Sequence, residues 1–570
     1  MTSTTRPRFE HADPDIAQMF LPKLVTTLRE GYGLDAFRRD ALAGLTVAVV
    51  ALPLSMAIAI ASGVGPERGL YTAIIGGFLV SALGGSRFQI GGPAGAFIVL
   101  VAASVHRHGV DGVALATMIA GAFLMLAGAL RLGMFIKLVP FPVTVGFTAG
   151  IAVIIFASQI HDLLGLKLSG PEPGELLPKL YALSGAIGSI SPHSVAVAAL
   201  TVGTIVLLPK LRPGVPSLLV AVILAATVTA VFQLPIETIG TRFGGIPQVL
   251  PTPHLPDLSL ARVQAVLPDA FAFALLGAIE SLLSAVVADG MSGRRHRSNC
   301  ELVAQGVANI GSGLFGGICV TGTIARTATN VRSGAHGPVS GILHSMFLLF
   351  FMLLAAPLAS YIPLAALAGV LAVVAWNMIE RPAIRALVRS SRGDVMVLLA
   401  TFALTTFRDL TEGIVVGVAL GAMLFIGRMS QSTSIEAGQP LAQEDVADEP
   451  GRPPLDEAVR TSFADTVVYR ISGAFFFGAA GAVGSILDRI ADQRRNLILD
   501  FSAVPLIDST GANLIESLAR KTKKSGVRLI IAGASRPVRR MLIAHGVRHY
   551  GVRFTADVKT AALTAHHVAS

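Results

Sequence analysis

Arg326 stands out first in this chain, because it interrupts a long apolar, membrane-type region. It lies in residues 320–327, Val-Thr-Gly-Thr-Ile-Ala-Arg-Thr, downstream of a glycine-rich break. A charge at bilayer depth is costly, so such a residue usually faces a cavity and marks the path of a substrate or ion. The free N–H groups and positive dipole end of a broken helix also favour anions. The sequence therefore predicts an anion site near the middle of the bilayer. A structural tie between helices is the alternative role for Arg326.

Glu280 is the second charged residue in an apolar setting. It lies in the middle of residues 273–283, and no other charge occurs between Asp269 and Asp289. A carboxyl group at this depth can bind and release a proton during transport. The alternative is a structural ion pair with Arg326, and the two roles can coexist.

The elements that hold these residues must be membrane-spanning helices. The chain has 570 residues, of which 53% are hydrophobic and 14% charged, and its mean hydropathy is +0.68. These values are too apolar for an ordinary soluble protein. A spanning helix needs about 20 mostly apolar residues. We expect about 12–14 spans, in or near residues 41–62, 69–84, 91–104, 113–130, 134–157, 193–209, 215–233, 267–289, 302–317, 323–333, 340–360, 363–377, 393–406 and 413–427.

Membrane topology explains most of the net charge of +10, and a nucleic-acid partner is not expected. Counted from a cytoplasmic N-terminus, the inner loops carry most of the cations, whereas outer loops such as residues 234–266 are poorer in them. This bias predicts an even number of spans with both termini in the cytoplasm. No signal peptide is evident at the N-terminus. The inner-loop cations are Arg87, Arg131, Lys210, Arg212, Arg294, Arg295, Arg297, Arg381, Arg385, Arg389 and Arg392.

A weak internal repeat links two glycine-rich breaks. Residues 82–85 (Ala-Leu-Gly-Gly) precede residues 91–94 (Gly-Gly-Pro-Ala), and residues 314–317 (Leu-Phe-Gly-Gly) precede residues 321–325 (Thr-Gly-Thr-Ile-Ala). Paired interruptions in two halves of a chain indicate the binding site of a transporter. Chance similarity in a glycine-rich membrane protein is the alternative.

Other polar groups predict no catalytic or metal chemistry. Cys300 and Cys319 have no metal-ligand spacing and are interpreted as packing residues. The loop histidines form no ligand pattern, and no catalytic triad or phosphate-binding loop is evident. Asp289 lies near the Arg294–Arg297 loop and is expected at the membrane interface. We expect no cofactor, no metal and no enzymatic activity.

The composition changes after about residue 428. Residues 430–463, rich in acidic residues and proline, are predicted to be a solvated linker. Strand-like runs then occur at residues 466–471, 496–501 and 527–532, with helical patterns at about 479–493 and 511–525. This alternation predicts a small α/β domain. Asp508 or Ser509 would cap the second of these helices, and a phosphate on Ser509 would also suit its N-terminus.

Together these motifs resemble the sulfate permease (SulP) family of anion transporters. The resemblance is carried by residues 51–57 with Gly69-Leu70-Tyr71, by Gly91-Gly92-Pro93, by residues 277–281 and by residues 325–332. The Asp508-Ser509-Thr510-Gly511 segment resembles the signature of a STAS domain. Residues 85–88, 277–283, 330–332 and 375–378 are similar to those of the bacterial C4-dicarboxylic acid transporters in the family.

The resemblance implies 14 spans in two inverted seven-span repeats, divided into a core and a gate, with a cytoplasmic STAS domain. Expected boundaries are 1–38 for a cytoplasmic N-terminal segment, 39–429 for the transporter domain, 430–463 for the linker and 464–560 for the STAS domain. The implied substrate site comprises Leu54, Ile58, Gly92, Pro93, Ala94, Thr323, Ala325 and Arg326, with Glu280 as the proton-coupling carboxylate and Ser509 as a possible phosphosite. Some relatives carry a polar residue at the position of Leu54 and a larger aromatic at that of Ala94, so Ala94 leaves room for a bigger anion.

The leading hypothesis is proton-coupled uptake of a C4-dicarboxylate such as succinate, fumarate or aspartate. A sulfate or bicarbonate transporter of the same architecture is the alternative, and a non-transporting membrane sensor is the third. The implied setting is the bacterial cytoplasmic membrane. The expected partners are protons, lipid, a second copy in a homodimer and a cytoplasmic protein at the STAS domain.

Overall fold

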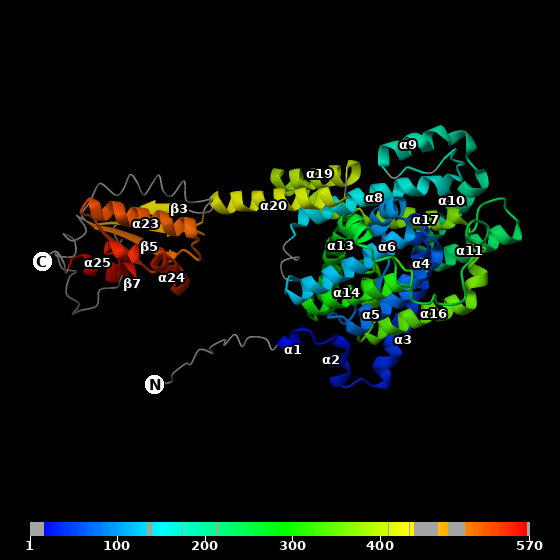
Figure 1. Ribbon diagram of the computed structural model, residues 1–570, viewed down its shortest axis with the longest axis horizontal. Coiled ribbons are helices and arrows are strands. Elements are labelled where there is room, and N and C mark those ends of the chain that lie inside the picture. The colour runs from blue at the N-terminus through cyan, green and yellow to red at the C-terminus, as the bar shows by residue number, and fades with distance from the viewer. Residues whose placement is uncertain are drawn as a thin grey trace. The chain divides into compact units, whose positions relative to one another are not determined.

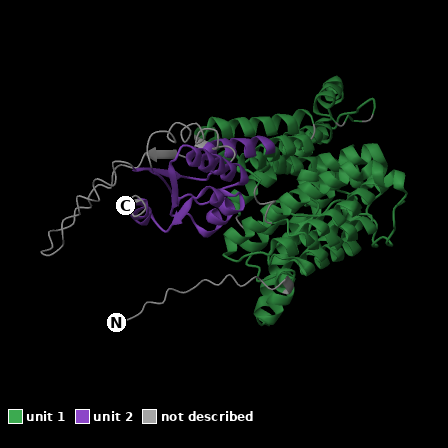
Figure 2. Ribbon diagram, turned by 60° about the vertical axis from the view of Figure 1, so that its left-hand side comes forward, with its two compact units in different colours: residues 1–418 green, residues 419–570 purple. Residues whose placement is uncertain are grey.

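The computed structural model describes residues 16–133, 139–170, 172–173, 175–212, 215–408, 410–431, 434–437, 466–476 and 496–566. The chain divides into two compact units, residues 1–418 and 419–570 (Figure 2). Within the described residues, the first unit is helical apart from one pair of two-residue strands, and the second contains a five-stranded sheet.

The described helices of the first unit can be followed along the chain in Figure 1. They are α1 (Ile16–Met19), α2 (Lys23–Arg29), α3 (Leu34–Ala61), α4 (Pro66–Tyr71), η1 (Thr72–Gly76), α5 (Gly77–Leu83), η2 (Gly95–Phe97), α6 (Ile98–Ala129), α8 (Phe141–Leu164), α9 (Leu176–Gly185), η3 (Ile187–Ser189), α10 (Pro192–Leu211), α11 (Ser217–Val231), α12 (Ile239–Phe243), α13 (Leu260–Ser292), α14 (Ser298–Leu314), α15 (Ile324–Arg332), α16 (Val339–Ala359), α17 (Leu364–Met378), α18 (Arg381–Ser390) and α19 (Arg392–Phe407). The last long helix, α20 (Leu410–Gln431), continues across the boundary at residue 418.

Within the described residues, eight helical stretches are long and apolar enough to cross a membrane. They are α3, η2 with α6, α8, α10, α13, α16, α17 with α18, and α20. α6 is broken at Gly109, whose φ of +69° and ψ of −176° are not helical. This break lies between the spans predicted at residues 91–104 and 113–130. The polytopic helical membrane domain is therefore confirmed, whereas the total of 14 spans stays a prediction.

The first unit contains two helical bundles. α3, α5, α6, α13, α14, α15 and α16 pack mainly on one another, and α8, α10, α11, α17 and α19 do the same. Close packing of α6 on α14 depends on Gly121 and Gly306, because a Cβ on either glycine would clash with the backbone oxygen of the other. The bundles meet where α3 contacts α17 and α11, and where η2 contacts α8. This arrangement matches the core and gate that the sequence resemblance implies.

The second unit is a sheet with helices on both faces. Its strands β3 (Ser434–Ala437), β4 (Thr466–Ser472), β5 (Asn496–Ala503), β6 (Arg528–Ala532) and β7 (Arg553–Thr555) are hydrogen-bonded in sequence order. β3 is antiparallel to β4, and the other pairs are parallel, with Leu499 opposite Ile531. α23 (Ser509–Lys524) and α24 (Arg536–Ala544) cover one face, while α25 (Val558–His566) covers the other. A short helix, η4 (Val547–Tyr550), follows α24.

The predicted strands and the helix at 511–525 are confirmed. The predicted helix at 479–493 lies outside the described residues. The predicted linker differs at Ser434–Ala437, which forms the edge strand β3. This segment precedes the acidic, proline-rich residues on which the linker prediction rested, and an edge strand needs only one neighbour for its backbone.

Candidate anion-binding site

The two glycine-rich breaks meet in the core bundle. Each contributes one short strand, β1 (Gly91–Gly92) and β2 (Thr321–Gly322), and the strands pair antiparallel with Gly91 opposite Gly322. Non-helical backbone at this depth must be satisfied by protein, and each break supplies the hydrogen-bond partners of the other. The internal repeat seen in the sequence is therefore realised as a contact between its two copies.

Polar side chains from α13 support this crossing. The Ser281 hydroxyl accepts a hydrogen bond from the Gly322 N–H at 3.1 Å and lies 2.8 Å from the Thr321 hydroxyl. Ser284 donates to Thr327 at 3.1 Å, and the side-chain amide of Gln89 donates to the Ser281 carbonyl at 3.0 Å. These bonds join both breaks to the helix that carries Glu280. The crossing is thus a fixed scaffold rather than a loose loop.

Arg326 lies in the first turn of α15, directly beside the other break. Its side chain is buried, and Nη2 donates to the Pro93 carbonyl at 3.1 Å. Within the described part of the chain, no acceptor lies within hydrogen-bond distance of its Nε and Nη1. A Cβ on Gly92 would clash with Nη1, so the absence of a side chain there makes room for the guanidinium. Arg326 therefore presents two buried donors that an anion can use.

Two helix N-termini also open at the crossing. η2 begins at Gly95 after Ala94, and α15 begins at Ile324 after Thr323. Their first N–H groups have no helical acceptor, and the α15 dipole adds positive potential. Ala94 is buried, whereas Ala325 is exposed. The Thr323 hydroxyl donates to the Ile90 carbonyl at 3.2 Å, so its proton holds the crossing together.

Apolar residues from both bundles surround this point. Leu54 and Ile58, one helical turn apart on α3, are buried in the same apolar cluster as Ala94. From the gate, Ile155 of α8 and Met378 of α17 lie 3.6 and 3.7 Å from the position of a Cβ built on Gly95. Neither Ile155 nor Met378 was identified from the sequence, because an apolar residue in an apolar span gives no signal.

Glu280 lies on α13 and is half-buried. Its Oε2 atom is buried and, within the described residues, has no hydrogen-bond partner. Among the described residues, no ion pair joins Glu280 to Arg326. The alternative role of Glu280 as the partner in a structural ion pair with Arg326 is therefore not realised in this conformation. Protonation of this oxygen would not require an ion pair among the described residues to break.

Two further buried polar residues escaped the sequence analysis. Glu301 of α14 accepts from the Ser86 N–H and from the Gln305 side chain, both at 3.0 Å, and so fixes the loop that leads to β1. His344 of α16 is fully buried, and neither ring nitrogen has a hydrogen-bond partner among the described residues. Like Arg326, His344 is a polar residue inside a predicted apolar span, at residues 340–360, so the sequence alone could have indicated it.

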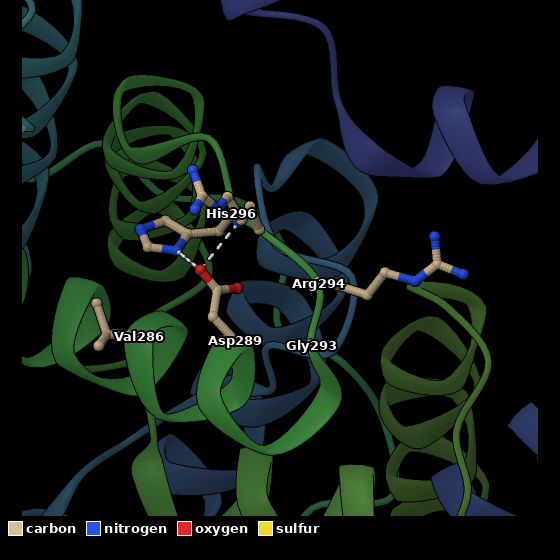
Figure 3. Close-up of a pocket in the computed structure, with 6 residues that line it drawn as sticks. Val286, Asp289, Gly293, Arg294 and His296 are labelled. Carbon is tan, nitrogen blue, oxygen red and sulfur yellow. Dashed lines mark hydrogen bonds and ion pairs between the residues drawn. The ribbon is translucent and has the colours of Figure 1, made fainter.

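A polar pocket lies at the end of α13, away from the crossing. It has a volume of about 500 Å³ and is lined by Val286, Asp289, Gly293, Arg294, Arg295 and His296. Figure 3 shows Asp289 directed towards His296, whose Nδ1 lies 2.6 Å from Oδ2, while Arg294 extends away from that pair. Asp289 thus ties down the loop with which the sequence associated it.

In the second unit, Asp508 is the N-cap of α23. Its Oδ1 accepts from the Gly511 N–H at 2.8 Å, which selects Asp508 over Ser509 for the capping role. Ser509 is exposed at the first helical position. Its exposure is compatible with modification, and the phosphosite stays a prediction.

Two discontinuous helices that meet beside a buried cation, between two bundles, define a transporter type of membrane protein. Comparison with known proteins is consistent with this class. The Sulfate permease family model matches residues 37–401, and the STAS domain model matches residues 458–561. The putative sulfate transporter YvdB of Bacillus subtilis is 39% identical over 523 residues, which cover 91% of this chain and 96% of the relative. The bicarbonate transporter BicA of a Picosynechococcus strain is 32% identical over 526 residues, which cover 89% and 90%.

Solved structures show the same fold. The transmembrane domain of a cyanobacterial BicA superposes with a TM-score of 0.62 at 32% identity and covers 67% of this chain and 98% of its own. A structure of SLC26A9 superposes with a TM-score of 0.84 at 18% identity and covers 97% and 94%.

The chain therefore belongs to the sulfate permease family, and it is an anion transporter of that family with a C-terminal STAS domain. The relatives named here carry sulfate and bicarbonate in their names. The closer similarity to C4-dicarboxylic acid transporters that the sequence suggested finds no support in these comparisons.

Proposed function

We propose that this protein is a secondary active transporter of a small inorganic oxyanion of the sulfate or bicarbonate class. The observation that carries the proposal is the pair of free, buried donors on Arg326, between two helix N-termini. Oxyanions are recognised by planar guanidinium donors and by backbone N–H groups of this kind. YvdB and BicA, whose names refer to sulfate and bicarbonate, support this substrate class over others.

The transport step would be a movement of the core against the gate. The anion would rest against Arg326, Gly92, Pro93 and Ala94 of the core, with Leu54 and Ile58 as an apolar wall. Ile155 and Met378 of the gate close the other side, because they approach Gly95 from the second bundle. Rigid movement of one bundle past the other would expose the anion alternately to the two sides of the membrane.

Glu280 would couple this movement to a proton. Its free Oε2 lies on the helix that holds both breaks through Ser281 and Ser284. A proton bound there neutralises the Glu280 carboxylate. The electrostatic potential at Arg326, and therefore the attraction for an incoming anion, would then change. The proposed setting is the bacterial cytoplasmic membrane with both termini in the cytoplasm, and the proposed assembly is a homodimer.

A C4-dicarboxylate is the second candidate substrate, and the small side chain of Ala94 favours it. A larger residue at this position would take up volume beside the first half-helix that a longer anion would need. The apolar wall of Leu54 and Ile58 could also contact the methylene groups of such a substrate.

Uptake into proteoliposomes separates these substrates. Purified full-length protein would be reconstituted, and the uptake of radiolabelled sulfate, bicarbonate and succinate measured with and without an inward proton gradient. Gradient-stimulated uptake of sulfate or bicarbonate, not competed by succinate, is the expected result. Succinate accumulation that neither inorganic anion inhibits would establish the dicarboxylate alternative. Absence of uptake of all three would contradict the proposed substrate class.

A further inference from the structure

The short helix α18 lies outside the proposed anion site. It lies between the apolar helices α17 and α19, and the chain leaves helical geometry at Ile379 and Glu380, immediately before it. Pro382 occupies the start of α18, where its missing N–H is not needed. The chain therefore turns between two membrane helices and forms a separate ten-residue helix.

One face of α18 is anchored in the gate bundle. Ala383, Ile384 and Leu387 point to the same side and pack against Val145 of α8 and Leu398 of α19. Leu387 is only 7% exposed. The apolar face thus has its partner within the protein, and α18 is held firmly to the bundle.

The opposite face carries a stripe of arginines. Arg381, Arg385 and Arg389 recur every four residues, so they lie on one side of the helix, and all three are exposed. In the described part of the chain, no carboxylate lies within ion-pair distance of any of them. Their charge is therefore not neutralised by these residues.

Exposed apolar side chains lie beside this arginine face, as they do in helices at a membrane interface. Val388 and Trp376 are each 58% exposed, and the Arg381 guanidinium lies 3.9 Å from the centroid of the Trp376 ring. Tryptophan is enriched at the level of lipid headgroups, and amphipathic helices with arginine on the polar face lie in that plane. The arrangement places apolar groups next to the three cations.

We propose that α18 is a binding surface for anionic phospholipid headgroups of the cytoplasmic leaflet. Charge complementarity supports this occupant: three exposed arginines without a described acidic partner match the phosphates of an anionic leaflet. The position of α18 on the cytoplasmic side follows the topology expected from the cation bias in the sequence. The proposal does not depend on which anion is transported.

Such a surface would connect lipid composition to the anion site. α18 follows α17 after two residues, and the last residue of α17 is Met378, which approaches Gly95 at the site. α18 also packs on α8, which contributes Ile155 to the same place. Lipid bound at α18 holds the gate at the membrane surface, so that the core moves against a fixed partner.

The test measures lipid binding by the full-length protein. Binding of phosphatidylglycerol and of phosphatidylcholine would be titrated by native mass spectrometry for the wild type, Arg385→Gln/Arg389→Gln and Arg385→Lys/Arg389→Lys. Arg294→Gln/Arg295→Gln is the matched control, because it removes two exposed arginines from another loop of the same predicted side. The glutamine pair in α18 should lower phosphatidylglycerol affinity about 30-fold, the equivalent of about 1 kcal/mol for each arginine. The lysine pair and the control should stay within a few-fold of the wild type.

Transport provides the second measurement. Wild-type uptake of sulfate or bicarbonate should be faster in vesicles that contain phosphatidylglycerol than in phosphatidylcholine alone. The α18 glutamine pair should lose this difference while matching wild-type uptake in phosphatidylcholine, which also shows that it is folded. Unchanged phosphatidylglycerol affinity in the glutamine pair would overturn the proposal. An equal loss in the Arg294/Arg295 control would overturn it too, because the effect would then reflect net charge rather than α18.

Discussion

At the scale of single residues, Arg326 shows how a costly charge is kept at bilayer depth. One hydrogen bond to the Pro93 carbonyl compensates part of its burial, while Nε and Nη1 have no hydrogen-bond partner within the described structure. Full neutralisation by an ion pair would leave no donor for a substrate. The donors that lack a hydrogen-bond partner are therefore the feature that would suit Arg326 to reversible binding of an anion.

Glu280 is expected to carry the coupled proton. Glu280→Gln keeps the size of the side chain and removes its titration, so uptake should become insensitive to an inward proton gradient, while anion affinity should equal that of the wild type with Glu280 protonated. Uptake into proteoliposomes over a series of external pH values measures this. Arg294→Gln serves as a control for a charge change elsewhere. Retention of full pH-dependent uptake by Glu280→Gln would remove the coupling role from this residue.

The sequence predicts Arg326 and Glu280 as site residues because a charge within an apolar run is rare, and the structure shows both with buried atoms that lack a hydrogen-bond partner among the described residues. The sequence could not identify Ile155 and Met378, since the gate wall consists of apolar residues among many others. Their position at the site depends on how the second bundle packs on η2, which is tertiary information. His344 and Glu301 are intermediate cases, because their types were informative but their complete burial was visible only in the fold.

At the scale of elements, the proposed site depends on two breaks in the helical bundle, and a helix begins directly after each of them. The β1–β2 pair satisfies the backbone freed by both interruptions, and the side chains of α13 fix its position. The glycine-rich breaks and the weak repeat made half-helices predictable. Their mutual pairing and its register were not, because a two-residue strand has no periodicity of its own.

Gly92 tests this crossing without removing a charged group. In Gly92→Ala the new Cβ would displace the Arg326 guanidinium, so anion affinity should fall roughly tenfold, the equivalent of one lost hydrogen bond to a charged group. Gly277→Ala on α13 is the matched control, because its Cβ would meet Phe97 and Leu124 at ordinary contact distances of 3.7 and 3.8 Å. Radiolabelled sulfate and bicarbonate binding to the purified variants measures the effect. Equal affinities in the two variants would argue against the contact between Gly92 and Arg326.

In the STAS domain, Asp500 predicts a pH dependence of local stability. Burial alone would raise the pKa of this carboxyl, but hydrogen bonds from Ser502 and Arg470 outweigh it and hold the pKa below its usual value. A folded-state pKa below that of the unfolded chain stabilises the fold at neutral pH, and the contribution is lost as the pH falls through the folded-state value. Asp500→Asn should therefore cost about 1.5–3 kcal/mol at pH 7 and progressively less in acid.

Hydrogen exchange of β5 in the full-length protein checks this expectation. Protection of β5 should be lower in Asp500→Asn than in the wild type at pH 7, and the two should converge after incubation at acidic pH. Identical protection at pH 7 would show that the Asp500 hydrogen bonds add nothing to the sheet.

At the scale of the whole molecule, the chain consists of two compact units. The described residues of the proposed anion site all belong to the helical unit, and the sheet with its capped helix α23 belongs to the second. The fold class of each unit was predictable, because apolar spans and alternating strand and helix patterns are strong signals. The division of the spans into core and gate came from the family resemblance, and β3 was missed because it lies inside a segment read as linker.

Removal of the STAS domain tests the division. A chain truncated after about residue 440 should lose expression, assembly or regulation, while the ratio of uptake rates among sulfate, bicarbonate and succinate should match that of the full chain. Uptake normalised to the amount of protein in the vesicles gives this ratio. A changed order of preference among the three anions would place part of the specificity outside the helical unit.

Uptake of radiolabelled sulfate and bicarbonate into matched proteoliposomes would show whether Arg326 holds the transported anion. The wild type, Arg326→Ala and the exposed-loop control Arg294→Ala would be compared at equal protein content. Loss of charge-assisted hydrogen bonds should lower the apparent affinity of Arg326→Ala about 10- to 100-fold for at least one of the two anions, while Arg294→Ala stays at the wild-type value. Wild-type affinity and rate in Arg326→Ala would show that anion binding does not depend on this guanidinium.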